Sequence, residues 1–316
     1  MDNEKKPLVV LTGPTAAGKT TLSLALAERI GGEIISADSI AVYRHMDIGS
    51  AKIRPEETHG IPHHLIDVLE PEEDFHVVLF QQLAKEAMKG IYERGHVPIV
   101  VGGTGFYIQA LTRDIDFTQA ENMEDLRNEL EVFARENGAH ALHERLRQVD
   151  PDSAAAIHEN NVKRVIRALE FYEQNNSPIS AHNQEQRQAK SPYNLACFVL
   201  TAPRPVLYER IDRRVDRMIE AGLVQEVRSL KERGCHKGMV SMQGLGYKEI
   251  LSYLDGEISL EEAIRILKRD TRHFAKRQLT WFRREEDVIW VDKSVFDYDD
   301  ERILEWMMQK IKEYQI

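Results

Sequence analysis

The residues best suited to chemistry lie near the N-terminus, in the stretch Gly-Pro-Thr-Ala-Ala-Gly-Lys-Thr. This spacing fits G-x-x-x-x-G-K-[ST], and the stretch lies between an apolar run and a helical pattern, which is the context of a phosphate-binding loop. Backbone N–H groups at a helix start attract anions, lysine adds a fixed cation, and a threonine hydroxyl can ligate a divalent cation. We predict a di- or triphosphate site with Mg²⁺ as cofactor and Thr20 as its ligand, formed by Gly13, Pro14, Thr15, Ala16, Ala17, Gly18, Lys19 and Thr20.

A carboxylate, Asp38, follows the next apolar run, Glu33 to Ala37. The carboxyl ends of strands in an open α/β sheet face the ligand crevice, so we expect Asp38 to lie opposite the phosphate loop. There it can accept a proton from an attacking nucleophile or help to position a metal-bound water. Capping of a helix by Asp38 or Ser39 is the structural alternative.

A glycine-rich turn, Gly102 to Gly105, ends another apolar run. Its glycines permit close backbone approach, and Thr104 offers a hydroxyl to a phosphate or a base. A purely structural turn would explain the glycines equally well.

Three arginines recur at i, i+4 and i+7 in a later helical pattern, so Arg210, Arg214 and Arg217 share one face. Such a face can clamp a diphosphate. Surface charge balanced by the acidic residues nearby is the alternative.

The elements that must position these residues alternate between strand and helix patterns, which is typical of a parallel α/β sheet. The expected strands are Leu8–Thr12, Glu33–Ala37, Val97–Val101, Leu195–Thr201 and Val288–Val291. The expected helices of this part are Gly18–Ile30, Phe75–Arg94, Pro205–Ala221 and Ser259–Arg284.

The alternation is interrupted by consecutive amphipathic helices, which we expect at Glu124–Glu136, Ala139–Val149 and Asn161–Gln174. We therefore predict a helical insertion domain, residues 113–192, within a core of residues 1–112 and 193–316. Two polar stretches, Asn175–Pro178 and Gln184–Pro192, resemble loops.

Charge is the main objection to a nucleic-acid substrate, because the net charge is −10 and phosphate binding is largely electrostatic. The cations are clustered, however: the stretch from Arg265 to Arg284 holds eight Lys or Arg and one acid, Asp270. A local excess of one sign can outweigh the average. A second basic stretch, Lys163 to Arg167, falls on the predicted helix from Asn161.

No apolar run approaches the roughly 20 residues of a membrane span, and no secretory signal is visible. We expect a cytoplasmic protein. His63 and His64 have no further partners at metal-ligand spacing, so we interpret them as structural or polar-lining residues.

Six segments in this order and spacing resemble the tRNA dimethylallyltransferase family: GPTAAGKT, ADSIAVYR with DIGSAK, IPHHLIDV, VGGTGFYI, NVKRVIRALE and QGLGYKEI. The resemblance runs through nearly the whole chain. It implies a P-loop NTPase-like core with the helical insertion contacting tRNA, and it is closest to the shorter bacterial type without a C-terminal zinc finger. Many members carry Gln where this chain has Ala41.

The resemblance implies transfer of a dimethylallyl group from dimethylallyl diphosphate to N6 of adenosine 37, in the anticodon stem-loop of tRNA. Asp38 would then be the general base, and one arginine of the later helix, for which we favour Arg214 over Arg210, would contact the diphosphate. Thr104 completes the expected catalytic set. The expected tRNA contacts are Asp38, Ser39, Ile40, Ala41, Thr104, Arg127, Lys163, Arg164, Val165, Ile166, Arg167, Gln243, Lys248, Arg269 and Arg272.

Two other functions fit parts of the pattern. A small-molecule or nucleotide kinase also has a phosphate loop, an aspartate and an arginine-bearing helix, although it has no need of the basic helical insertion. A non-catalytic RNA-binding protein would not need Lys19, Thr20 and Asp38. We expect the protein to act as a monomer.

Overall fold

The computed structural model describes residues 5–117, 124–188 and 190–316. Its internal contacts divide the chain into two compact units. Unit 1 comprises the N-terminal part to Thr112 and the part from Ser191 to Ile316, and unit 2 is Arg113–Lys190. The second junction falls two residues before the boundary expected from the sequence.

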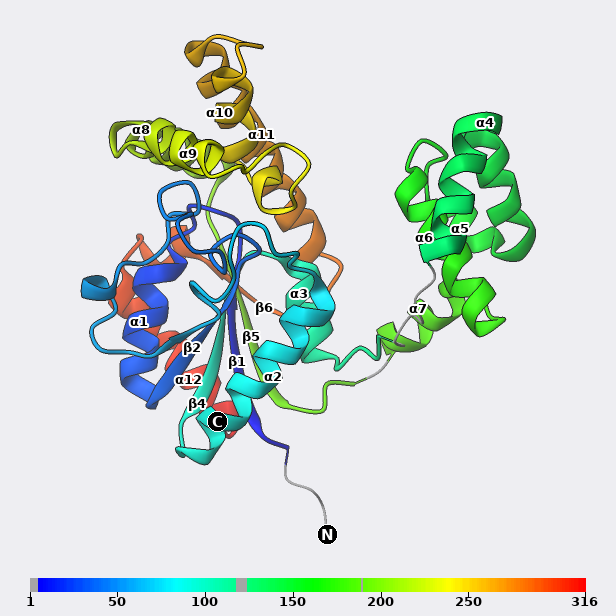
Figure 1. Ribbon diagram of the computed structural model, residues 1–316. Coiled ribbons are helices and arrows are strands. Elements are labelled where there is room, and N and C mark those ends of the chain that lie inside the picture. The colour runs from blue at the N-terminus through cyan, green and yellow to red at the C-terminus, as the bar shows by residue number, and fades with distance from the viewer. Residues whose placement is uncertain (1–4, 118–123, 189) are drawn as a thin grey trace. The chain divides into compact units, whose positions relative to one another are not determined.

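Unit 1 is built on six parallel strands in the order β3-β2-β4-β1-β5-β6 (Figure 1). In register, Val10 of β1 lies between Val100 of β4 and Cys197 of β5, so β1 occupies the interior of the sheet. A strand covered on both faces is apolar at successive positions, which explains the uninterrupted apolar runs. The strands are β1 (Pro7–Thr12), β2 (Gly32–Ala37), β3 (His63–His64), β4 (Val97–Gly102), β5 (Asn194–Thr201) and β6 (Ile289–Asp292).

Helices cover both faces of this sheet. Val9 and Leu11 pack with α1 (Lys19–Ile30) and α12 (Asp300–Glu313), whereas Leu8 and Val10 face the side of α2 (Val77–Glu93) and α3 (Gly105–Thr112). Alternate residues of β1 therefore belong to different cores, as the period of a strand requires. The blue α1 and the cyan α2 lie on opposite sides of the sheet in Figure 1.

Four further helices lie beyond the carboxyl ends of the strands in Figure 1. They are α8 (Arg204–Glu220), α9 (Leu223–Glu232), α10 (Tyr247–Leu254) and α11 (Leu260–Phe282). Buried residues of these helices, among them Val215, Val227, Ile250 and Leu267, join the core of the α2 side. The layer places arginines of α8 and polar residues of α11 above the sheet edge where the phosphate loop lies.

Unit 2 is a bundle of helices with its own core, which includes Leu130, Leu142, Leu146 and Val165. Its elements are α4 (Glu124–Val149), α5 (Pro151–Ala156), α6 (Val162–Asn175) and α7 (Ile179–Gln188). Gly138 interrupts α4 with φ 86°, a conformation that glycine adopts without strain. This break separates the two helices expected there. The described residues of unit 2 contain no strand, as expected.

The loop predicted at Gln184–Pro192 is wrong for its first half, because residues up to Gln188 belong to α7. The sequence interpretation also missed α3, α5, α9, α12 and the two-residue β3. No helix among the described residues is long and apolar enough to cross a membrane.

Candidate functional site

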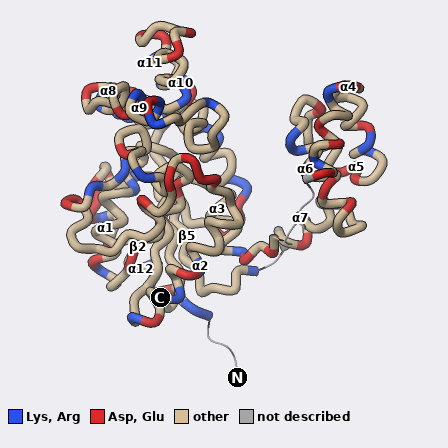
Figure 2. Tube along the Cα trace, in the orientation of Figure 1, with Lys and Arg blue, Asp and Glu red and all other residues tan. Residues whose placement is uncertain are grey.

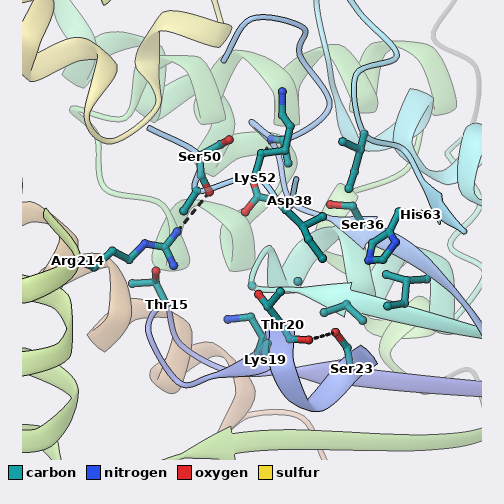
Figure 3. Close-up of a pocket in the computed structure, with 18 of the residues that line it drawn as sticks. Thr15, Lys19, Thr20, Ser23, Ser36, Asp38, Ser50, Lys52, His63 and Arg214 are labelled. Carbon is teal, nitrogen blue, oxygen red and sulfur yellow. Dashed lines mark hydrogen bonds between the residues drawn. The ribbon is translucent and has the colours of Figure 1, made fainter. Parts of the chain in front are cut away.

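A pocket of about 150 Å³ lies at the carboxyl ends of β1, β2 and β4. Thr15, Lys19 and Thr20 contribute its phosphate-loop side, Asp38 follows β2, and Arg214 enters from α8 (Figure 3). Figure 3 shows Ser36 and His63 at the opposite end of the pocket from Arg214. Residues far apart in the sequence thus meet at one sheet edge.

The phosphate loop connects β1 directly to α1, as its sequence predicts. Gly13 and Gly18 have φ of 139° and 88°, and a side chain on Gly13 would collide with the backbone of Leu200 on β5. These two positions therefore require glycine. The turn leaves the N-terminal end of α1, with its unpaired N–H groups, directed at the pocket.

Lys19 is partly buried in the pocket, and its ammonium donates hydrogen bonds of 2.9 Å to the carbonyls of Gly13 and Pro14. Burial, together with the positive charge of Arg214, lowers the pKa of Lys19 to about 8, and the carboxylate of Asp38 opposes this shift. Two partly buried cations near one another raise each other's energy, and an anionic ligand between them would relieve this cost. The pocket is electrostatically prepared for a diphosphate.

Arg214 and Arg210 lie in different surroundings. The Arg214 guanidinium lines the pocket and donates a 3.2 Å hydrogen bond to the carbonyl of Ser50, while burial lowers its pKa. The guanidinium of Arg210 lies 5.1 Å from the ring centre of Tyr298. The arrangement favours Arg214 as the diphosphate contact.

One oxygen of Asp38, Oδ1, accepts hydrogen bonds from the backbone N–H groups of Ile40 (2.8 Å) and Ala41 (3.2 Å). The carboxylate therefore orders the turn after β2, where no helix starts for it to cap, and also lines the pocket. Its second oxygen accepts no hydrogen bond from any residue that the structure describes, so it is available to a ligand. The two roles are compatible because they use different oxygens.

The oxygen atoms in the pocket suit Mg²⁺, which prefers carboxylate, hydroxyl and water ligands. The Thr20 side chain is exposed at the pocket, and Asp38 faces it across the same space. The Thr20 hydroxyl would hold the ion, with water among its other ligands, which leaves the second oxygen of Asp38 available to the substrate.

Gln278 of α11 was not identified from the sequence. Its Oε1 accepts the N–H of Thr15 at 3.0 Å, and its Nε2 donates to the carbonyl of Gly103 at 2.9 Å. A side chain on Gly103 would collide with Gln278. The buried amide therefore ties the phosphate loop to the glycine-rich turn, which explains why that turn needs glycine at this position.

Thr104 directly precedes α3, and its N–H donates to the carbonyl of Ala37 at 3.3 Å. The turn is thus attached to the end of β2, next to Asp38. Thr104 does not line the pocket that contains Lys19 and Arg214. Its expected catalytic role stays a prediction.

The basic cluster on α11 consists of two different halves. In the N-terminal half the guanidinium groups are paired: Arg265 with Glu262, Arg269 with Asp270, and Arg272 with Asp212 of α8. The expected tRNA contacts Arg269 and Arg272 therefore have acidic partners, which reduces the charge they offer to a phosphate. Sequence spacing did not reveal the partner on α8.

The C-terminal half of α11 forms a second hollow, which we call the basic groove. It is lined by His273, Lys276, Arg277, Thr280, Trp281 and Arg284. Within the described part of the chain, no acidic side chain pairs with its three Lys and Arg residues. The Trp281 indole N–H is buried without a hydrogen-bond partner in the same part of the chain. The clustering of cations seen in the sequence was the available signal for this groove.

In unit 2, Lys163, Arg164 and Arg167 are exposed on α6, as expected for a surface that contacts RNA. The side chains of Val165 and Ile166 are buried in the core of the unit, so their expected contact with tRNA stays a prediction that only their backbone could fulfil. On this helix Val165, Ile166 and Leu169 fall on one face, and the basic residues fall on the opposite one.

Arg127 of α4 donates to both oxygens of the buried Glu170 carboxylate, at 2.7 and 2.9 Å. A buried carboxylate needs such a partner, so this arginine has a structural task. Lys and Arg occur together with Asp and Glu on the helices of unit 2 (Figure 2).

The segment around Gln243 approaches the Asp38 turn, because Gly244 packs against the side chain of Ile40. Gln243 is exposed, and its amide donates to the carbonyl of Lys237. Lys248 pairs with the neighbouring Glu249 at 3.5 Å. Ser39 and Ile40 are partly exposed beside this segment, whereas Ala41 is buried against the pocket.

Known proteins of one family match this chain over almost its whole length. The family model described as IPP transferase matches residues 41–285, and the one described as isopentenyl transferase matches residues 6–70. A tRNA dimethylallyltransferase of Lachnoclostridium phytofermentans is 59% identical over 98% of this chain and 99% of its own length. One of Acetivibrio thermocellus is 50% identical over 96% of each chain.

Two solved structures are similar to this chain. A full-length tRNA isopentenylpyrophosphate transferase of Bacillus halodurans is 48% identical, with a TM-score of 0.74 and 98% of each chain covered. A eukaryotic dimethylallyltransferase acting on tRNA is 31% identical, with a TM-score of 0.77 over 91% of this chain and 74% of its own. The P-loop NTPase-like α/β fold expected from the sequence is confirmed.

Proposed function

This chain belongs to the tRNA dimethylallyltransferase family, and we propose that it transfers a dimethylallyl group from dimethylallyl diphosphate to N6 of adenosine 37 in the anticodon loop of tRNA. The observation that carries the assignment of residues is the single pocket that holds Lys19, Arg214 and Asp38 together. Two cations and one carboxylate fit a reaction in which a diphosphate leaves and a nucleophile loses a proton.

The leaving group is held by the phosphate loop. As the allylic carbon–oxygen bond breaks, negative charge accumulates on the departing diphosphate, next to Lys19 and Arg214. Fixed cations placed where charge develops stabilise a transition state more than its ground state. Mg²⁺, when bound at Thr20, would neutralise further charge on the diphosphate.

Asp38 acts as the general base. The adenine N6 forms the new bond to the allylic carbon and becomes acidic as it does so, and the free Asp38 oxygen takes its proton. A carboxylate is too weak a base to remove that proton beforehand. The base must leave its stack to reach the pocket, and the adjacent Ser39–Ile40 and Gln243–Gly244 segments are suited to hold the nucleotides around it.

We assign the basic groove and the exposed cations of α6 to the tRNA backbone. The groove offers cations without acidic partners together with an aromatic side chain, a combination that suits single-stranded RNA. Arg269 and Arg272 would contribute less, because Asp270 and Asp212 already pair with them. The protein would work as a monomer in the cytoplasm, where its substrate is found.

The test is to incubate the protein with unmodified tRNA, Mg²⁺ and dimethylallyl diphosphate, and to analyse the nucleosides by mass spectrometry. A mass gain of one prenyl group on adenosine 37 is expected. A parallel reaction with ATP tests the kinase alternative. Phosphate transfer from ATP without prenyl transfer would overturn the proposal, and tight tRNA binding without turnover of either donor would favour a non-catalytic RNA-binding protein.

A further inference from the structure

Glu226 of α9 makes an unusual set of hydrogen bonds outside the pocket. Its carboxylate accepts three consecutive backbone N–H groups, from Asp47 (3.0 Å), Ile48 (2.8 Å) and Gly49 (3.1 Å). It also accepts the hydroxyl of Tyr247, at 2.8 Å. A carboxylate can accept four such bonds, and successive N–H groups form a concave site for an anion. In this fold the anion is a side chain of the protein itself.

Packing holds the same loop in place. Tyr247 is fully buried, and a side chain added to Gly49 would lie only 2.5 Å from its ring. The loop can therefore approach Tyr247 only because position 49 is glycine. Hydrogen bonds and close packing together determine the path of residues 47–49.

The residues that follow this loop form one wall of the pocket. Ser50, Ala51, Lys52 and Ile53 all line it. The carbonyl of Ser50 accepts the hydrogen bond from Arg214, and no other hydrogen bond or ion pair of the Arg214 side chain involves a described residue. The direction of this partly buried guanidinium thus depends on where the loop places one carbonyl.

We propose that Glu226 is a positioning residue for the donor: by holding residues 47–49 it places the Ser50 carbonyl, and through it aims Arg214 at the diphosphate. The inference rests on the proposed function, in which Arg214 contacts the donor. Glu226 itself does not line the pocket, so its effect on the reaction is indirect.

The negative charge of Glu226 matters for this role. Hydrogen bonds to an ionised acceptor are about twice as strong as those between neutral groups. Glu226→Gln keeps the shape but replaces one acceptor oxygen by an NH₂ group, which would then face a backbone N–H. One such mismatch costs about as much as leaving a buried donor without a partner, so we expect the loop to shift or loosen.

The experiment measures donor binding directly. The Kd of inorganic pyrophosphate with Mg²⁺ is determined by calorimetry, and KM is measured separately for dimethylallyl diphosphate and for tRNA. For Glu226→Gln we expect the pyrophosphate Kd and the donor KM to rise about tenfold, while the KM for tRNA stays within about twofold. Glu232→Gln, on the same helix and exposed, is the matched control and should change neither.

A double-mutant cycle separates positioning from general destabilisation. If Glu226 acts through Arg214, Glu226→Gln should add less than about twofold to the donor KM once Arg214 is alanine, because coupled residues are not additive. Independent tenfold effects in both backgrounds would overturn the proposal. Tyr247→Phe removes one of the four bonds and should shift the donor KM in the same direction by a smaller factor, which keeps the test valid should Glu226→Gln fold poorly.

The two hypotheses fail in different ways. Absence of pyrophosphate binding to the wild-type protein would contradict the proposed function. Normal binding to the wild-type protein and to Glu226→Gln alike would contradict only the role of Glu226.

Discussion

Replacing Lys19 with Met should abolish donor binding and, without ligand, make unit 1 more stable at neutral pH. Burial lowers the pKa of Lys19 from 10.5 to about 8, and each pKa unit corresponds to about 1.4 kcal/mol. Keeping this amine charged therefore costs the folded state about 3 kcal/mol. The variant loses the two hydrogen bonds to Gly13 and Pro14, worth about 1 kcal/mol each. The net expected gain at pH 7 is about 1 kcal/mol.

The sign of this difference in stability between Lys19→Met and the wild type reverses as the pH rises. Between pH 8 and 10.5 the unfolded chain holds a proton on Lys19 that the folded chain has released, so the wild-type stability rises with pH in this window. The stability of the variant relative to the wild type should accordingly fall by about 2 to 3 kcal/mol between pH 7 and pH 10.

Tryptophan fluorescence during urea denaturation is the suitable assay, because Trp281, Trp290 and Trp306 all lie in unit 1. Added pyrophosphate with Mg²⁺ should stabilise the wild-type protein and leave Lys19→Met unchanged. Thr21→Val, at an exposed position two residues further along α1, serves as the control and should differ from the wild type by an amount independent of pH. A difference between Lys19→Met and the wild type that stays constant from pH 7 to 10 would refute the reasoning.

Three further outcomes are expected. Asp38→Asn should retain the bonds to Ile40 and Ala41 but lower single-turnover transfer by about 10² to 10⁴ at saturating substrates; a loss below about tenfold in quenched-flow kinetics would remove Asp38 from proton transfer. Glu33, whose pKa Arg94, His64 and His96 help to lower to about 2, should contribute stability above pH 4.5 that is lost as the pH falls toward 2. Glu33→Gln should therefore destabilise unit 1 at pH 7 and flatten its acid denaturation curve, and equal slopes from pH 5 to 2 would contradict this. Reversing Lys276 and Arg277 to Glu should weaken tRNA binding and reduce its salt dependence more than reversing Arg269 and Arg272, which filter-binding titrations at several salt concentrations can decide.

Local sequence patterns sufficed for much of the fold. The apolar runs of β1, β2, β4 and β5 are covered on both faces, so their composition alone distinguishes them. The phosphate loop could be predicted because its glycines and Lys19 follow one another in the chain. By contrast, β3 has only two residues, His63 and His64, and its pairing with Ile34 gives no periodic signal.

The site could be predicted only where its chemistry is local. Asp38 was chosen by its place at a strand end. The helix face indicated three arginines, among which Arg214 was favoured under the family resemblance, and both Asp38 and Arg214 line the pocket. Gln278 and Glu226 were missed because their partners lie far away: Thr15 is separated from Gln278 by 263 positions, and Asp47 from Glu226 by 179. The acidic partner of Arg272 was missed for the same reason, since only the packing of α8 against α11 brings Asp212 to it.

The interior place of β1 in the sheet has a consequence for how the protein is made. Synthesis produces the phosphate loop early, but β1 must wait for β4 and β5 on its two sides, and β5 follows the whole of unit 2 in the chain. Gly13 then packs against Leu200, and the Thr15 N–H finds its acceptor on Gln278 later still. Because these long-range contacts form only after most of the chain has left the ribosome, a nascent chain that ends before β5 carries the complete phosphate-binding sequence without the site. Unit 2, whose core is formed by residues close in sequence, can fold before the sheet into which it is inserted.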